Sequence, residues 1–267
     1  MDKDKISMVL SSCDNYEDAW EPFFCQFKKN WPTFDMPVYL CTETKTFKYD
    51  GFDIRCPLAC GPVYRDWSKL LIKLLKKIDT EYIFFMLDDF WLTKPVDPDK
   101  FNKMVQYLIS NPKIGFICLR HETHEYAPES EKQYAIDCEY PELLECLYGR
   151  SFRITTQAGI WRKDYLLKLL RGHESAWYFE NRANWRSQFY KYRVFDVKET
   201  VLIYPVSGVF GGGKFFREYL SDFPESVIKK SVEKRGVIGF NEMRTYPKAK
   251  KGIAYLWSVI RSVWPKL

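Results

Sequence analysis

The feature that most constrains the fold of this 267-residue chain is a run of six apolar residues that ends abruptly in two aspartates. The run is Tyr82–Leu87, and Asp88 and Asp89 follow it directly. An uninterrupted apolar run of this length predicts a strand buried on both faces, as in the middle of a parallel sheet. Ligands of open α/β sheets bind where the strands present their carboxyl ends, so the two carboxylates are expected at a binding edge.

The segments around this strand alternate between helical and extended patterns. An amphipathic helix is predicted over Trp67–Ile78, where apolar residues recur at helical spacing opposite a lysine face, with Asp66 at the N-cap. Further strands are predicted at Ile6–Ser11, Pro37–Thr42, Phe52–Cys56, Ile114–Leu119, Ile154–Trp161 and Val201–Val206, and further helices at Ala19–Lys29, Asp99–Ser110 and Asp164–Leu170. This alternation predicts an α/β fold with a mostly parallel, open, doubly wound sheet flanked by helices.

Two later segments have distinctive compositions. Residues 121–150 are polar, acidic and rich in tyrosine, and are expected to form a long active-site segment or lid. Ala249–Trp264 is predicted to be an amphipathic helix in which Trp257 and Trp264 belong to an apolar stripe with basic flanks. Such a helix lies in the membrane interface with its basic groups toward anionic lipid. The alternative is that it docks onto the core of its own domain.

Composition limits the classes of protein to which the chain can belong. A formal net charge of +6 is too small to indicate nucleic-acid binding, and it suits a protein that meets phosphates or an anionic lipid surface. The eight cysteines form no Cys-x-x-Cys pair and none has a histidine at zinc-finger spacing, which predicts reduced thiols in a reducing compartment. The apolar stretch that ends at Leu10 is shorter than a signal-peptide core, and no window is long enough to span a membrane. These features predict a cytoplasmic protein, either soluble or peripheral to a membrane.

The adjacent carboxylates of Asp88 and Asp89 indicate a cation site. Such a pair at the end of a buried strand is costly unless it is solvated, hydrogen-bonded or bound to a cation. A hard ion such as Mg²⁺ or Mn²⁺ typically takes one or two carboxylates plus phosphate oxygens. It would also neutralise the charge that develops on a diphosphate leaving group. The alternative is an acidic pair that only forms a turn or caps a helix.

The segment Phe84–Phe90, with the preceding helix and Thr80–Ile83, resembles the core of GT-A-fold glycosyltransferases. More narrowly, it resembles the bacterial enzymes that assemble capsular or lipopolysaccharide glycans. In that fold an Asp-x-Asp motif, or its x-Asp-Asp variant, ends the fourth strand and binds the metal–nucleotide diphosphate. The chain carries the variant, so the resemblance implies Asp89 as the ligand of Mn²⁺ or Mg²⁺ and Asp88 as a residue that faces the donor ribose or sugar.

The resemblance also implies a division of the chain. Residues 1–247 are expected to form one GT-A-like domain, with a nucleotide-sugar-binding half over 1–120 and an acceptor-binding half over 121–247, followed by the basic amphipathic helix 248–267. Residues expected to contact the nucleotide base or the donor, with a UDP-sugar favoured, are Ser11, Ser12, Asp14, Tyr16, Arg65 and Asp66. The alternative for the Ser-Ser-Cys-Asp turn is ordinary loop chemistry.

A second stretch, Gln157–Arg162 followed by a helix and Gly172–Glu180, resembles the part of these transferases that lies under the acceptor and ends in the catalytic carboxylate. An inverting enzyme needs one general base to deprotonate the acceptor hydroxyl. The resemblance implies Glu180 in this role, with Glu174 as the second candidate. The alternative is that Glu174 caps a helix and that Glu180 is a solvated helix residue.

The same stretch supplies the expected acceptor contacts. Gln157 belongs to the segment under the acceptor in the resemblance. Trp177 and Phe179 would form an apolar wall that raises the pKa of the base and offers a face on which a sugar ring can stack.

The glycine run Gly211–Gly213 and Lys214 follow the predicted strand Val201–Val206. Consecutive glycines let the backbone approach a ligand closely, and a lysine there can contact a diphosphate. The spacing is not that of a Walker A motif, and the alternative is a flexible surface loop. His121 and His124 have a spacing that could suggest a metal site, but a loop near the acceptor is the preferred interpretation.

Together with these features, the resemblance implies an inverting hexosyl- or N-acetylhexosaminyl-transferase of bacterial surface polysaccharide synthesis, peripheral at the inner face of the cytoplasmic membrane. It would move a sugar from a UDP-sugar to a glycan or lipid-linked saccharide, with Asp89 and Lys214 stabilising the leaving diphosphate and Glu180 removing the acceptor proton. The alternatives are a metal-dependent phosphoesterase or phosphotransferase and a non-catalytic, carbohydrate-binding protein of the membrane surface. The residues leave the sugar, the linkage, inversion versus retention, strict metal dependence and oligomeric state open.

Overall fold

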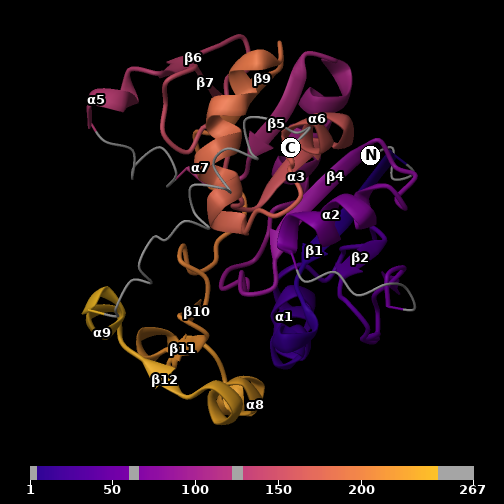
Figure 1. Cartoon of the computed structure of the whole chain (residues 1–267), viewed down its shortest axis with the longest axis vertical. Coiled ribbons are helices and arrows are strands. Elements are labelled where there is room, and N and C mark those ends of the chain that lie inside the picture. The colour runs from indigo at the N-terminus through magenta and orange to yellow at the C-terminus, as the bar shows by residue number, and fades with distance from the viewer. Residues whose placement is uncertain (1–4, 60–65, 122–128, 246–267) are drawn as a thin grey trace.

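The computed structural model describes residues 5–59, 66–121 and 129–245. Its main feature is a nine-stranded sheet with the strand order β3-β2-β1-β4-β8-β5-β9-β7-β6, flanked by helices (Figure 1). The predicted α/β class and the helix-flanked sheet are therefore confirmed. The predicted helix over residues 248–267 lies outside the described residues.

The amino-terminal half of the sheet is parallel, as the alternating pattern predicts. Its strands are β1 (Ile6–Ser11), β2 (Val38–Cys41), β3 (Ile54–Arg55) and β4 (Tyr82–Leu87). Ser11 is in register with both Cys41 and Leu87, so three strands end level with one another at one edge of the sheet. Ligands are expected at this edge because it is formed by the carboxyl ends of the strands.

The other half of the sheet contains two reversed strands, although most strands of the whole sheet run in one direction, as predicted. Its strands are β5 (Ile114–Cys118), β6 (Ala135–Asp137), β7 (Leu143–Cys146), β8 (Gly159–Arg162) and β9 (Arg193–Val197). Strand β8 runs antiparallel between β4 and β5, and β7 runs antiparallel to both β6 and β9. A strand buried on both faces has the same apolar pattern in either direction, so the sequence contained no signal for this reversal.

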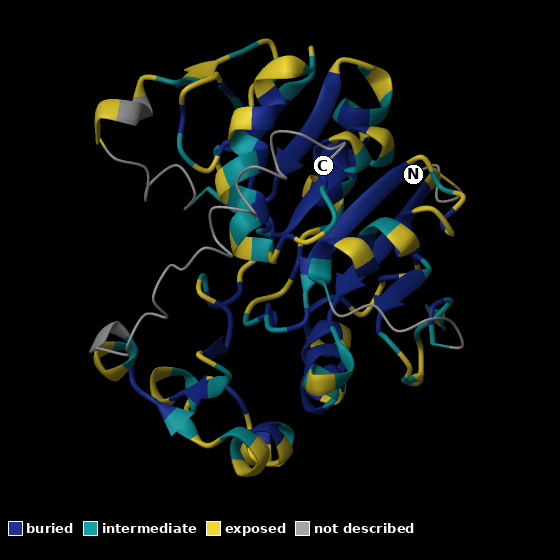
Figure 2. Ribbon diagram, viewed as in Figure 1, coloured by how far each residue is buried: buried dark blue, intermediate teal, exposed yellow. Residues whose placement is uncertain are grey.

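Helices on opposite faces of the sheet divide the interior into two hydrophobic cores. The helices are α1 (Glu17–Asn30) and α3 (Pro98–Ser110) on one face, and α2 (Trp67–Leu75), α6 (Lys163–Leu169) and α7 (Ala176–Arg186) on the other. Successive residues of a strand point to opposite faces, and accordingly Met8 and Leu10 enter the first core whereas Val9 enters the second. Figure 2 shows the central strands buried between these layers.

A small three-stranded sheet follows the main one along the chain. It contains β10 (Phe210–Gly211), β11 (Lys214–Phe216) and β12 (Val237–Ile238), and is accompanied by α8 (Glu225–Arg235) and α9 (Phe240–Thr245). Helix α8 is joined to α1, because Ser231 donates to the carbonyl of Asp18 while Lys234 and Arg235 donate to the buried Asp18 carboxylate. These contacts fix the small sheet against the start of α1.

Two predicted segments have other structures. Val201–Val206 forms no strand: Val201 and Leu202 are buried, but the segment is irregular, and the backbone N–H of Thr93 donates to the carbonyl of Ile203. Residues 129–150, within the predicted lid, contain the short helix α5 (Glu129–Lys132) and the β6–β7 hairpin at the far edge of the main sheet. They extend the sheet and are not a lid.

The described cysteines are all free thiols, as predicted. Burial raises the pKa of several of them, among them Cys56, which favours the protonated thiol. No helix among the described residues combines the length and the apolar character that crossing a membrane requires.

Candidate active site

A cavity of about 380 Å³ opens at the edge of the sheet where β1 and β4 end. It is enclosed by these strand ends, by the 3-10 turn η2 (Asp14–Tyr16), by the segment after β2, and by the first turns of α2 and α7. The lining residues are Ser11, Ser12, Cys13, Tyr16, Glu43, Asp66, Trp67, Leu70, Leu87, Asp88, Asp89 and Ala176. The fold therefore brings the predicted acidic pair together with Ser11, Tyr16 and Asp66.

Asp88 is held in a buried chain of hydrogen bonds. Its carboxylate accepts a short hydrogen bond from the Ser12 hydroxyl, which in turn accepts from the indole N–H of Trp20 at 2.7 Å. Only 8% of Asp88 is exposed, and burial raises its pKa to about 7, an effect that the bond from Ser12 and the charge of Arg235 partly oppose. The side chain is thus fixed in orientation at the wall of the cavity.

Asp89 has an incomplete set of partners. Its Oδ1 atom is buried and has no hydrogen-bond partner among the described residues, and burial together with the charge of Asp88 raises its pKa well above the ordinary value. A Cβ atom at Gly208 would lie 2.0 Å from Asp89 Oδ2, and Gly208 has φ +72°, so only glycine fits beside this carboxylate. An enclosed acidic pair with an unpartnered oxygen fits a cation.

The described residues contain no group of three or more His, Cys, Asp or Glu side chains arranged to hold a metal ion. Ions such as Mg²⁺ are commonly bound through only one or two carboxylates, with phosphate oxygens and water completing the shell. Asp88 and Asp89 therefore fit an ion that is shared with a phosphorylated ligand rather than one caged by protein alone.

Two aromatic residues shape the walls of the cavity. Trp67 donates through its indole N–H to the Ser11 hydroxyl at 2.8 Å and packs on Phe179, with ring centroids 5.6 Å apart. Phe179 is only 1% exposed, so it supports Trp67 from behind and offers no open face of its own. Tyr16, on the other side, lies under the Arg235 guanidinium at 4.0 Å.

Asp14, which was predicted to contact the donor, is not among the cavity-lining residues, whereas Glu43, for which no role was predicted, is. The Asp14 carboxylate does not line the cavity; it accepts hydrogen bonds from Thr44 and from the backbone N–H groups of Glu43 and Lys45, which hold its pKa below the ordinary value despite partial burial. Glu43 does line the cavity, its carboxylate accepts from the Asp14 backbone N–H, and burial raises its pKa. The sequence contained a signal for Glu43: it directly follows the predicted strand Pro37–Thr42, as Asp88 directly follows Tyr82–Leu87.

Asp66 occupies the N-cap position of α2 but makes no side-chain capping bond. Instead, its Oδ2 atom lies 3.3 Å from His173 Nδ1, and His173 has φ +79°. The carboxylate therefore stays at the rim of the cavity. Arg65 lies outside the described residues.

Glu174 forms a buried ion pair. Its two oxygens accept from Arg186 at 2.8 and 2.7 Å, and Arg182 lies 3.6 Å away. Its backbone N–H and carbonyl bond to Ser68 in α2. Arg186 of α7 therefore occupies both carboxylate oxygens of Glu174. The backbone of Glu174 bonds to Ser68 of α2, so the residue links the two helices.

Glu180 is half-buried on α7 and is held on one side only. Its Oε1 atom accepts from the Thr155 hydroxyl, the Thr156 hydroxyl and the Thr156 backbone N–H at 2.6–2.8 Å. Its Oε2 atom has no hydrogen-bond partner among the described residues. Three donors on one oxygen leave the other oriented and available.

The remaining predicted acceptor residues, Gln157 and Trp177, both precede Glu180 in the chain. Gln157 is fixed by Tyr204, which donates to Oε1 at 2.9 Å, and by the Val206 carbonyl, which accepts from Nε2 at 3.2 Å. Trp177 is 60% exposed at the start of α7, next to the cavity residue Ala176.

The glycine run before Lys214 has a local explanation. Gly212 and Gly213 have φ +57° and +80°, and they form the turn of the hairpin that pairs Gly211 with Lys214. Two residues with positive φ are what a tight hairpin turn of this hand requires. Lys214 is half-exposed on β11 and is not among the residues that line the cavity. The hairpin turn by itself accounts for the glycines.

The histidine pair is only partly described. His121 Nδ1 lies 3.1 Å from the Val197 carbonyl, and its backbone N–H donates to Thr200, which ties the end of β5 to the end of β9. His124 lies outside the described residues.

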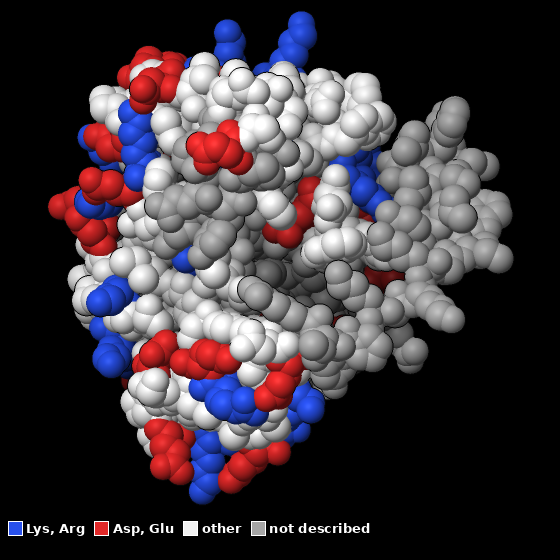
Figure 3. Space-filling model, turned by 90° about the vertical axis from the view of Figure 1, so that its left-hand side faces the viewer, with Lys and Arg blue, Asp and Glu red and all other residues white. Residues whose placement is uncertain are grey.

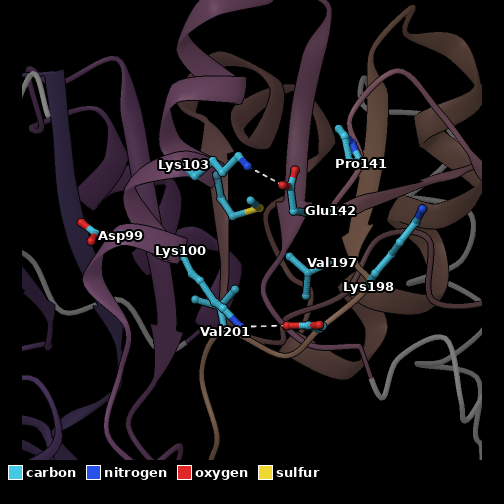
Figure 4. A pocket seen from close by; sticks show the side chains of 10 residues that line it. Asp99, Lys100, Lys103, Pro141, Glu142, Val197, Lys198 and Val201 are labelled. Carbon is cyan, nitrogen blue, oxygen red and sulfur yellow. Dashed lines mark hydrogen bonds and ion pairs between the residues drawn. The ribbon is translucent and has the colours of Figure 1, made fainter.

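A second cavity, of about 440 Å³, lies between α3 and the ends of β7 and β9. Figure 4 shows two ion pairs among its charged side chains: Lys100 contacts Glu199 at 2.7 Å, and Lys103 contacts Glu142. None of the site residues predicted from the sequence lines this cavity. Lys and Arg residues are also interspersed with Asp and Glu over the face shown in Figure 3.

No protein-family model matches the sequence, and no curated protein sequence matches it. Among solved structures, S. aureus TarS 1-349 superposes with a TM-score of 0.46 at 10% identity, over 74% of this chain and 59% of that one, so the chain spans less than two thirds of it. Glucosyl-3-phosphoglycerate synthase from Mycobacterium tuberculosis, in complex with Mn²⁺ and UDP-glucose, gives a TM-score of 0.45 at 12% identity over 88% and 80%. A cytidylyltransferase from Leptospira borgpetersenii gives 0.42 at 12% identity over 92% and 98%.

Proposed function

We propose that the chain is a glycosyltransferase that moves a sugar from a nucleotide-sugar donor, preferably a UDP-sugar, onto an acceptor hydroxyl. The observation that carries the proposal is the carboxylate of Asp89 beside Asp88 at the carboxyl edge of the sheet, with one oxygen buried and without a partner among the described residues. A buried ionised carboxylate without a partner is costly. A divalent cation bound together with a diphosphate would remove that cost.

The cavity residues have distinct roles toward the donor. Asp89, with Asp88 beside it, would hold Mn²⁺ or Mg²⁺, and the bound ion supplies positive charge to the departing diphosphate. The rings of Trp67 and Tyr16 offer faces to a nucleobase, and Glu43 offers an acceptor to a base N–H such as that of uracil. The proposed donor site does not include Lys214, because Lys214 is not among the residues that line the cavity.

Glu180 is the proposed general base on the acceptor side. Thr155 and Thr156 hold its Oε1 atom, so Oε2 can accept the proton of the attacking hydroxyl. Glu174 does not suit this role because Arg186 occupies both of its oxygens. One positioned base acting in a direct displacement gives inversion at the anomeric carbon.

The wider parts of the proposal rest on the sequence pattern. They are the donor half 1–120, the acceptor half 121–247, a membrane-facing segment 248–267, and a glycan or lipid-linked acceptor in bacterial surface polysaccharide synthesis. A membrane-facing segment would place the cavity near an acceptor that is attached to lipid.

The test combines binding and turnover. Titration calorimetry of the full chain against a panel of nucleotide sugars, with and without Mn²⁺, should show metal-dependent binding of one nucleotide class. Asp89→Asn should abolish that metal dependence, and Glu180→Gln should keep donor binding but lower transfer by about 10²-fold or more. The matched control is Glu199→Gln, an exposed acid of the other cavity, which should change neither.

Metal-dependent donor binding and transfer by Asp89→Asn at wild-type levels would remove the assignment of the acidic pair. Hydrolysis of phosphoesters without sugar transfer would favour a phosphoesterase.

A further inference from the structure

Helix α7 exposes large apolar side chains that a surface helix normally buries. A helix on the surface of a globular protein normally turns its apolar residues inward and its polar residues toward solvent. Helix α7 buries Arg186 together with Phe179 and Ala183, and it exposes Trp177 and Trp185. Arg186 is buried because it pairs with Glu174, but no contact within the described part of the fold accounts for the exposed tryptophans.

The exposed residues form a ridge. Trp177, Asn181 and Trp185 follow one another at intervals of four residues, and Phe189 continues the interval in the 3-10 turn η3 (Ser187–Phe189). Residues at i, i+4 and i+8 lie along one slanted row on a helix. At a rise of about 1.5 Å per residue, Trp177 and Trp185 are about 12 Å apart along the axis.

The aromatic members of the ridge are open to a partner. Trp177, Trp185 and Phe189 are 60%, 47% and 67% exposed, and the rings of Trp185 and Phe189 contact each other at 4.8 Å. In Figure 2 exposed and half-buried residues run along α7. Contiguous exposed apolar surface of this kind marks an interaction site.

The position and the charge of the ridge indicate its partner. It begins at Trp177, next to the cavity residue Ala176, and runs away from the cavity. The exposed positions of α7 and η3 are Trp177, Asn181, Trp185, Gln188 and Phe189, and none carries a charge. A surface for anionic lipid would be expected to have basic residues beside its aromatics. Flat rings interleaved with amides suit sugar rings, which have apolar faces and hydroxyl edges.

We infer that this ridge binds the sugar units of an extended, oligomeric acceptor glycan whose terminal hydroxyl reaches the cavity. The inference rests on the proposed sugar transfer and adds the class of acceptor: a chain of several sugars rather than a single monosaccharide. Trp185 and Phe189 contact units remote from the reacting one, and Trp177 contacts those nearest the cavity.

The experiment measures binding of the full-length chain to immobilised oligosaccharides of defined length, from disaccharides to octasaccharides of varied sugar composition. The wild-type chain should bind at least one series with an affinity that rises with length. Trp185→Ala should weaken binding of the long members by roughly tenfold or more, as expected for truncation of a tryptophan anchor, and leave the disaccharide unchanged. Trp185→Tyr should restore most of the affinity because it keeps a ring.

The matched control is Ile136→Ala, an exposed apolar side chain on β6, which should bind like the wild type. Because Trp185 is half-exposed, the melting temperature of the alanine variant should change little, which separates loss of binding from loss of folding. Binding of the Mn²⁺-nucleotide sugar is measured in parallel on the same variants and should be unaffected.

Three results would overturn the inference: no glycan of the panel bound by the wild type, equal binding by Trp185→Ala, or Trp185-dependent binding to phosphatidylcholine–phosphatidylglycerol vesicles or self-association in place of glycan binding. If donor binding is absent while length-dependent glycan binding is present, the proposed sugar transfer is contradicted and the assignment of the ridge as a glycan-binding surface is supported. If donor binding is present and glycan binding is absent, only the assignment of the ridge as a glycan-binding surface is contradicted.

Discussion

Replacing Glu174 by alanine separates a structural role of this residue from a catalytic one. Glu174 and Arg186 are 2% and 3% exposed and are joined by two hydrogen bonds of 2.8 and 2.7 Å. Removing one partner of a buried pair leaves an uncompensated charge and typically costs about 3–5 kcal/mol. The upper part of this range is expected, because Arg182 would then face Arg186 without the intervening carboxylate.

The assay is equilibrium unfolding in urea, followed by tryptophan fluorescence and circular dichroism. A loss of about 4 kcal/mol lowers the folding equilibrium constant by nearly three orders of magnitude, which a shift of the urea midpoint reports directly. The double variant Glu174→Leu with Arg186→Met should recover most of the loss, because an apolar pair of similar volume removes both buried charges. Glu199→Ala removes only an exposed pair and should leave the midpoint essentially unchanged.

The reasoning would be refuted if Glu174→Ala unfolded at the wild-type urea concentration while sugar transfer disappeared. That result would return Glu174 to the role of general base.

Three further predictions concern the acidic pair and its supports. Burial raises the pKa of Asp88 to about 7, so between about pH 4 and 7 the folded chain keeps a proton at Asp88 that the unfolded chain has lost, and the contribution of Asp88 to the unfolding free energy should fall as the pH rises. Asp88→Asn should flatten this fall in urea titrations at successive pH values, and Mn²⁺ should oppose it in the wild type. Gly208→Ala should cost at least about 1 kcal/mol through its positive φ and should weaken Mn²⁺-dependent donor binding, because the new Cβ meets Asp89. Arg235→Gln should lower stability by about 3 kcal/mol, since it leaves the buried carboxylate of Asp18 with one fewer cation, and should raise the dissociation constant of the donor.

Each of these has a control or a contradicting result. An unfolding free energy with the same pH dependence in the wild type and in Asp88→Asn would contradict the raised pKa of Asp88. Gly172→Ala, where no atom lies within 4 Å of a new Cβ, should leave donor binding intact. Arg217→Gln removes an exposed ion pair beside the small sheet and should behave like the wild type.

The amino-terminal half of the chain was predictable because its signals are local. The run Tyr82–Leu87 became β4, Ile6–Ser11 became β1, and the helix begun at Trp67 became α2. Apolar periodicity and an abrupt change to acid are read from neighbouring residues, and parallel strands joined by helices place their carboxyl ends together. The sequence therefore anticipated a shared edge for Ser11, Asp66 and Asp88.

The errors arise where an outcome depends on a distant partner. Strand β9 (Arg193–Val197) was missed because charged residues interrupt its apolar pattern. The segment Val201–Val206 looked like a strand, but its described backbone bonds to other segments go to Leu119 and Thr93 and form no regular ladder. Phe179 looked like an acceptor wall, but the position of Trp67 places it in the core.

The sequence by itself determined the α/β class, the buried central strands and the acidic pair at their carboxyl edge, because these follow from hydrophobic periodicity within a few residues. Only the tertiary structure decided which carboxylates are free to act. Glu174 is bound by Arg186, Asp14 is bound by the backbone near Thr44, and Glu180 keeps one open oxygen, while Asp89 is enclosed by Gly208. The physical reason is that burial, charge pairing and steric enclosure are set by groups far away in the chain, whose approach no local pattern encodes.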